Sequence, residues 1–258
     1  MDKVFAISIT TYRELVRGQV LYTALFVTAA LVLVASAFGS VSIGDQILVI
    51  KDFGLFSISL SSVAFAVVAG AMLLRKELER KTIYNILAKP VERWEFVLGK
   101  FFGMALTIGL TMSLMMAGLQ AYLFLFEGHL DPALWAALYF YFLEVLIICA
   151  AAMFFSSIVV TPLLGGLFTF GLFLAGRSVE YLLYFVQEGS VSGLAASICK
   201  GVYYLLPHLS SLQVGNEIVF GESAPTAEFA GWCGLYATSY AAVLLVLAII
   251  FFRRKEFN

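Results

Sequence analysis

The sequence predicts an all-α integral membrane protein, and three observations lead to that class. Hydrophobic residues make up 62% of the 258 positions, charged residues only 13%, and the mean hydropathy is +0.96. A soluble domain carries about 25% charged residues. The apolar residues lie in runs of about 20, the length that crosses a bilayer as a helix. No strand-like alternation persists, and open sheet edges cannot face lipid, so the expected spans are helices.

Six apolar runs have the length and composition of transmembrane helices. No linker divides them, so residues 1–258 are expected to form a single transmembrane domain. The runs are residues 19–39, 54–74, 101–126, 134–156, 163–186 and 231–252.

The N-terminal segment before the first run is predicted to be an amphipathic helix lying in the membrane interface. Over residues 2–17, one helical stripe carries Val4, Ile7, Ser8, Thr11 and Leu15, with the arginines off it. The sequence 35–37 resembles a signal-peptidase site, which leaves cleavage as an alternative. The apolar run before it is longer than the h-region of a signal peptide, about 7–15 residues, which favours an uncleaved span.

The basic residues predict the orientation of the spans. The N-terminal segment holds three Lys and Arg, residues 75–100 hold seven and the C-terminal tail three, so 13 of the 16 fall on one side. Lys and Arg concentrate on the cytoplasmic side. With six spans, both termini are expected in the cytoplasm of a prokaryotic cell, with the protein in its inner membrane. The net charge of −1 gives no reason to expect nucleic-acid binding.

Before the last run, the longest outer loop contains a further helical pattern. An interfacial or re-entrant helix is expected over about 191–205, ending before Pro207, because apolar residues recur there at helical spacing. An ordinary packed loop is the alternative.

The segment 75–100 is the most polar part of the chain, with seven Lys or Arg and four Glu. A helix is expected from Arg75 to Leu87, with an apolar stripe and a break before Pro90. A second helix is expected to start near Val91. The positive-inside rule alone accounts for the basic residues. It does not account for the glutamates or the stripe, which favour docking of a soluble partner in a groove.

Motifs for catalysis and for nucleotide binding are absent from the sequence. No Walker A, HExxH or GxSxG pattern occurs, and the three cysteines match no metal or redox spacing. No enzymatic activity, cofactor or metal is therefore expected in this chain. Glu127, His129 and Asp131 could together bind a divalent metal. The simpler interpretation is a polar hairpin in which Asp131 and Pro132 begin a helix.

Glu144 lies near the middle of the fourth run, where an ionisable group is costly and faces the bundle interior, a cavity or a partner. It can line a translocation path or contact another subunit. It can instead be protonated and hydrogen-bond a neighbouring helix. Gly99 and Gly103 form a GxxxG pattern that lets helices approach closely. It is expected to pack the third run within its own chain rather than to build a dimer.

The segment 75–100 also resembles a known family. Glu77, Lys81-Thr82, Leu87, Pro90, Arg93, Leu98-Gly99-Lys100 and Gly103 are similar to the first cytoplasmic loop of type-2 ABC exporter permeases. The N-terminal helix, the six spans and the long outer loop before the last span are also similar to that family. The likeness covers essentially the whole chain, and the nearest subgroup is the compact one that includes the nitrous-oxide-reductase maturation permease.

The resemblance implies a mechanism and partners. Two permease copies, identical or homologous, would pair in the lipid bilayer, each with a cytoplasmic ABC ATPase that binds ATP and Mg. ATP-driven closure of the ATPases would push on the loop and open a path through the membrane. By this analogy the coupling residues are Glu77, Arg80, Lys81, Thr82, Ile83, Leu87, Pro90 and Arg93. A stand-alone secondary transporter and a membrane scaffold protein are the alternatives.

Overall fold

A computed structural model describes residues 2–39, 46–79, 92–128, 130–159, 161–181, 184, 194–219 and 225–254. Every regular element within these ranges is helical, which confirms the predicted all-α class. The elements are α1 (Asp2–Val16), α2 (Gln19–Gly39), α3 (Gln46–Glu79), α5 (Arg93–Glu127), α6 (Ala133–Ile158), α7 (Pro162–Arg177), α9 (Leu194–Leu205), the 3-10 turn η1 (Ser210–Leu212), α10 (Gly215–Val219) and α11 (Ala227–Arg254).

Four of the described helices are long and apolar enough to cross a membrane. The qualifying segments are Ile47–Met72, Arg93–Leu125, Ala133–Ile158 and Ala227–Arg253. A fifth crossing is possible at the N-terminus, where Lys3–Val16 and Leu21–Val34 together have the required composition but meet at a bend of 54°. The chain is therefore a multi-pass membrane protein, whereas the count of six spans stays a prediction.

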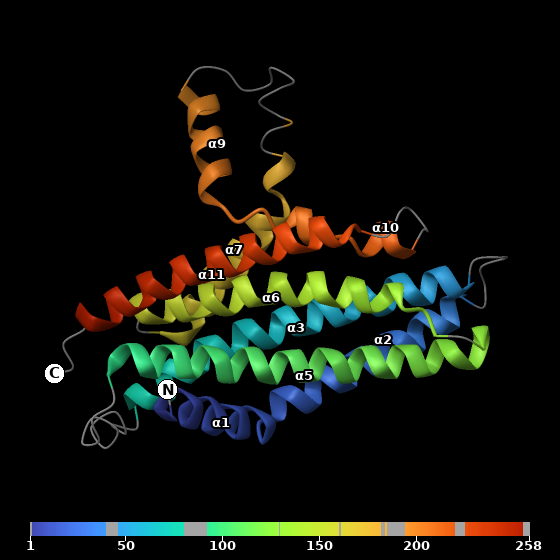
Figure 1. The fold of residues 1–258 in the computed structure, drawn as a ribbon, viewed down its shortest axis with the longest axis horizontal. Coiled ribbons are helices and arrows are strands. Elements are labelled where there is room, and N and C mark those ends of the chain that lie inside the picture. Colours follow the sequence, from blue (N-terminus) through green and yellow to red (C-terminus); the bar gives the residue numbers. More distant parts are fainter. Residues whose placement is uncertain are drawn as a thin grey trace.

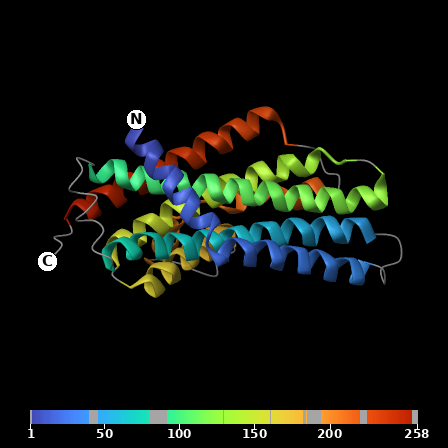
Figure 2. The same cartoon turned by 90° about the horizontal axis from the view of Figure 1, so that it is seen from below.

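The long helices run along a common axis and form one bundle around α6 (Figures 1 and 2). Helix α6 contacts α3, α5, α7 and α11, and α2 packs along α3. The start of α1, the end of α3, the start of α5 and the end of α11 all lie at one end of the bundle (Figure 1). That end is called the loop end below.

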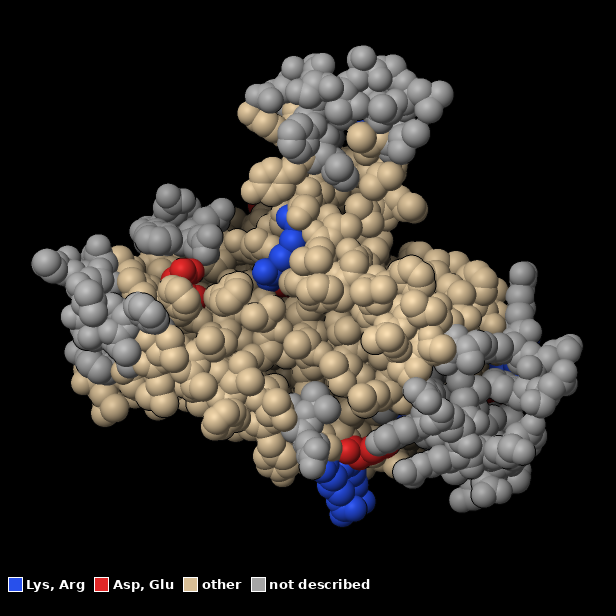
Figure 3. Space-filling view, turned by 180° about the vertical axis from the view of Figure 1, so that it is seen from behind, with Lys and Arg blue, Asp and Glu red and all other residues tan. Residues whose placement is uncertain are grey.

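The surface of the bundle is apolar where its helices face outward. The side chains of Phe26, Leu125 and Leu163 are each at least 74% exposed. One face is drawn in Figure 3, where uncharged residues cover most of the described surface. Inside the bundle, several buried hydroxyls bond to their own helix: Ser62, Thr107 and Thr169 each donate to the carbonyl four residues earlier. An apolar exterior with internally satisfied polar groups suits lipid as the solvent.

Helix α1 forms over the predicted range and packs against α5 through the GxxxG pattern. A Cβ added at Gly99 would lie 2.7 Å from the Ile7 side chain, and one at Gly103 would lie 2.6 Å from the Ser8 carbonyl. The Ser8 hydroxyl donates to the Gly99 carbonyl at 3.0 Å, and Thr11 is fully buried. The prediction that this pattern packs within the chain is confirmed. The placement of α1 in the membrane interface stays a prediction.

The predicted fifth span differs from the structure. Helix α7 ends at Arg177 and not at residue 186, so its 16 residues extend only about 24 Å, short of the hydrocarbon thickness of about 30 Å. The reason is a tertiary contact at Gly176. Its carbonyl accepts the Leu209 N–H at 3.2 Å, and a Cβ there would lie 2.8 Å from the Pro207 carbonyl oxygen.

A helix follows near the predicted range 191–205, as α9, and it ends before Pro207. It stands out sideways from the bundle (Figure 1). Its end is tied to the middle of α11, because the Tyr240 hydroxyl donates to the Leu205 carbonyl at 3.0 Å and the His208 N–H donates to the Tyr236 hydroxyl at 2.9 Å. The helical part of the prediction is confirmed, whereas its position at a membrane surface is untested.

Candidate functional site

The segment predicted to couple the chain to an ATPase connects α3 to α5 in the sequence, and the described ends of these two helices lie at the loop end of the bundle. Glu77 lies in the last turn of α3, and Arg93 is the first residue of α5. The predicted second helix near Val91 is thus confirmed within two residues. The other predicted coupling residues lie outside the described residues: Arg80, Lys81, Thr82, Ile83, Leu87 and Pro90.

The first turn of α5 is fixed by its own side chains. Glu92 is the N-cap in an extended conformation, and its backbone N–H donates to Oε2 of Glu95 at 2.9 Å. The Trp94 indole N–H donates to the Glu92 carboxylate. A glutamate three residues into a helix that accepts the N-cap N–H satisfies a donor that the helix itself cannot pair. These bonds therefore stabilise the first turn of α5.

Arg93 links this first turn to the end of α11. Its Nη1 donates to the carbonyls of Phe252 at 3.1 Å and Arg253 at 2.8 Å. The last carbonyls of a helix have no partner within it, and a basic side chain also interacts favourably with the helix dipole there. The Phe96 and Phe252 rings stack beside it, 6.0 Å between centroids. A residue proposed from the sequence as a coupling residue thus joins the first and last turns of two long helices.

The same end of α5 also binds α1 through two ion pairs. Lys100 lies 3.6 Å from Glu14 and is almost fully buried, with its ammonium 5.6 Å from the centre of the Phe96 ring. Lys3 lies 3.8 Å from Glu95. The first two turns of α5 are therefore in contact with both α1 and α11. We call this set of contacts, made by Arg93, Glu95, Phe96 and Lys100, the α5 junction.

A second polar site lies in the middle of the bundle, where Glu144 of α6 meets Arg177 of α7. The Nε and Nη2 atoms of Arg177 donate to the two carboxylate oxygens of Glu144 at 2.8 and 2.9 Å. Nη2 also donates to the Ser59 hydroxyl of α3 at 2.7 Å. Glu144 is 0% exposed, and the guanidinium lies 4.8 Å from the centre of the Phe173 ring.

Glu144 bonds a neighbouring helix, as one of its two predicted interpretations expected, and its partner there is a basic side chain. The two parallel N–H···O bonds form a bidentate arginine–carboxylate pair, which is a charge-assisted contact. The pair ties three helices together at mid-depth. The sequence does not identify the partner, because Arg177 stands 33 residues away, in the predicted fifth span, and no local pattern pairs the two residues. The early end of α7, which places Arg177 at this depth, could not be read from an apolar run that continues to residue 186.

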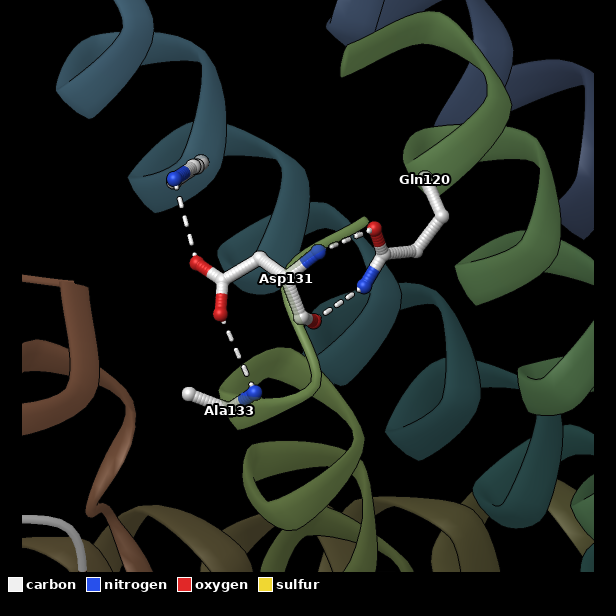
Figure 4. Close-up of polar contacts among 4 residues, drawn as sticks. Gln120, Asp131 and Ala133 are labelled. Carbon is white, nitrogen blue, oxygen red and sulfur yellow. Dashed lines mark hydrogen bonds and ion pairs between the residues drawn. The ribbon is translucent and has the colours of Figure 1, made fainter. Parts of the chain in front are cut away.

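The predicted alternative of a metal site involves Asp131, which instead holds the start of α6 (Figure 4). Its Oδ1 accepts the Ala133 N–H at 3.0 Å and its Oδ2 accepts from Lys51 Nζ at 3.1 Å. The Gln120 side chain bonds the backbone of Asp131: its Oε1 accepts the Asp131 N–H, and its Nε2 donates to the Asp131 carbonyl. The helix-start interpretation is confirmed for Asp131. The described residues contain no cluster of three metal-binding side chains, whereas His129 and the Glu127 side chain lie outside them.

A bundle of long apolar helices with an apolar exterior defines a multi-pass α-helical membrane protein. The family model described as ABC-2 family transporter protein matches residues 28–257, and the chain belongs to that family. The protein is therefore a membrane permease subunit of an ABC transporter, and family members of this kind work with an ABC ATPase subunit and are not themselves catalytic. A search of curated proteins finds no match to the chain.

Proposed function

We propose that this chain is the permease of an ATP-driven exporter in a prokaryotic inner membrane, coupled to a separately encoded cytoplasmic ATPase through the segment 75–100. Family membership supports the ABC transporter role. The observation that supports coupling at this place is the α5 junction. A push on the segment before Arg93 would reach α1 and α11 through hydrogen bonds and ion pairs rather than through a flexible linker.

Two further features belong to this proposal. The chain would act as a pair of permease subunits, each with one ATPase that binds ATP and Mg, and the ATPase would turn over only in the assembled complex. Both termini and the segment 75–100 would face the cytoplasm, as the distribution of Lys and Arg indicates. Within this family the sequence pattern suggests the compact six-span subgroup that includes the nitrous-oxide-reductase maturation permease.

Purification of the chain alone and after co-expression with a candidate partner ABC ATPase tests the proposal. We expect ATP hydrolysis by the complex and none by the isolated permease, because the chain has no Walker A loop. Robust hydrolysis by the isolated, contaminant-free chain would refute it. For the orientation, we expect a cysteine at position 92 to be labelled only from the cytoplasm and one at position 222 only from outside; labelling of both from one side would refute it.

A further inference from the structure

A cavity of about 420 Å³ lies between α3, α6 and α7, next to the mid-bundle ion pair. Cavities of about 300–1,000 Å³ are the size that holds small organic ligands. Phe53 and Phe56 of α3 supply apolar walls, Ser59 and Tyr141 supply hydroxyls, and Asp52 and Arg177 supply charges. Phe53 is 46% exposed and Phe56 is 50% exposed, so the cavity is open along α3.

The two charged groups of the cavity differ in their partners. The Arg177 charge is neutralised, because both oxygens of the buried Glu144 carboxylate accept from it. Asp52 lies within the apolar segment Ile47–Met72, about 9 Å from the start of α3, and forms no hydrogen bond or ion pair with any described residue. An ionisable side chain in an apolar helix that faces a cavity is a candidate for ligand binding, and Asp52 lines this cavity.

We propose that this cavity binds a monovalent organic cation with an apolar body, and that Asp52 is its counter-ion. A positive guest would give Asp52 a counter-charge, since the one described basic group that lines the cavity, Arg177, is already paired with Glu144. The faces of Phe53 and Phe56 attract cations and also cover apolar surface. Asp52 and both rings come from the same two turns of α3, which places the charge beside the aromatic walls.

An anionic guest is disfavoured by the same contacts. An anion would have to displace the Glu144 carboxylate from Arg177. Glu144 has no exposed surface, so water could not solvate the displaced carboxylate. Separating a buried pair leaves an uncompensated charge, which is strongly unfavourable. The anion would also be repelled by Asp52. The proposal concerns binding by this chain alone, so it is tested without ATP or the ATPase, and its failure would leave the proposed transporter role intact.

Tetraphenylphosphonium and tetraphenylborate form a suitable pair of probes, because they share one shape and carry opposite charges. We expect the purified permease in detergent to bind the phosphonium, and Asp52→Asn to weaken that binding about tenfold or more while leaving the borate no weaker. Phe56→Leu should weaken phosphonium binding by about threefold or more, through loss of a ring face. Gel filtration would establish that each variant is folded.

Two control variants make the same chemical changes elsewhere. Glu228→Gln removes an exposed carboxylate in the first turn of α11, and Phe26→Leu removes an exposed ring of α2. Both should bind the phosphonium as the wild type does. The proposal is overturned if the wild type does not bind the phosphonium, or if a folded Asp52→Asn variant binds it as tightly as the wild type. Should Asp52→Asn not fold, unchanged binding by Phe56→Leu would overturn it instead.

Discussion

The α5 junction and the mid-bundle ion pair both join helices through charged side chains, but they differ in how the charges are paired. At the α5 junction each ion pair has one buried and one more exposed partner: Lys100 and Glu95 are 5% and 12% exposed, whereas Glu14 and Lys3 are 33% and 49% exposed, and the N–O distances are 3.6 and 3.8 Å. In the middle of the bundle, Glu144 has no exposed surface, and Arg177 bonds it with two donors. Exposed pairs contribute little to stability, whereas breaking a buried pair is costly. The comparison predicts that breaking the mid-bundle pair costs more stability than breaking a contact at the α5 junction.

The largest effect is expected from breaking the buried pair on one side only. Glu144→Leu leaves the Arg177 guanidinium without its carboxylate and should lower the free energy of unfolding by about 3–5 kcal/mol. Unfolding in mixed detergent and SDS micelles measures this change.

The double variant Glu144→Leu with Arg177→Leu serves as the control for this experiment. It removes both charges at once and should recover most of the stability, because replacing a buried pair with apolar side chains is often neutral or stabilising. Equal loss in the single and double variants would show that the pair is not the source of the effect, and the contrast between the two regions would then fail.

A smaller effect is expected where α1 touches α5. Gly103→Ala places a Cβ 2.6 Å from the Ser8 carbonyl and from Thr11, so α1 must shift, and we expect a loss of about 1–3 kcal/mol. Gly118→Ala on the same helix is the matched control, because nothing lies within 4 Å of its added Cβ. It should be neutral or stabilising by up to about 1 kcal/mol. The same unfolding measurement compares them, and equal effects would argue against close α1–α5 packing.

The smallest change in stability is expected at the α5 junction itself. Arg93→Met keeps the length of the side chain but removes the donors to the Phe252 and Arg253 carbonyls, and should cost about 1 kcal/mol. Arg13→Met makes the same change at an exposed arginine of α1 and should cost less than about 0.5 kcal/mol. If Arg93→Met lowered the free energy of unfolding as much as Glu144→Leu, the predicted difference between the α5 junction and the mid-bundle pair would be wrong.

Local sequence patterns predicted the features that depend on local physics. Apolar length located the long helices, the break before Pro207 located the end of α9, and small residues at Gly99 and Gly103 located a close helix contact. The early end of α7 and the Glu144–Arg177 pair could not be predicted in this way. Both depend on contacts between residues 33 positions apart, Gly176 with Leu209 and Glu144 with Arg177, and no local periodicity records such a contact.

The eight coupling residues of the segment 75–100 were predicted from a resemblance to a family and from an apolar stripe. Of the eight residues in that set, Arg93 has a described side chain. Its bonds to the last carbonyls of α11 could not be predicted, because only the tertiary fold brings the end of α11 next to the start of α5. The Asp131 contact with Ala133 was predictable, because a short polar side chain before a helix is a local capping signal.

The most direct test of the central claim, that the segment 75–100 docks and couples the ATPase, uses Ile83→Asp and Leu87→Asp. Each places a charge in a contact that would be desolvated on docking, which costs several kcal/mol unless the charge is paired. Lys89→Gln is the control, because Lys89 lies off the predicted apolar stripe, and loss of a single charge in contact with solvent costs about 0–1 kcal/mol. The measurement is the ratio of ATPase to permease after affinity purification, together with ATP turnover and transport by the complex. The account predicts normal membrane insertion of both aspartate variants with loss of the ATPase or of coupling, and wild-type behaviour of Lys89→Gln. Wild-type stoichiometry, turnover and transport in both aspartate variants would contradict it.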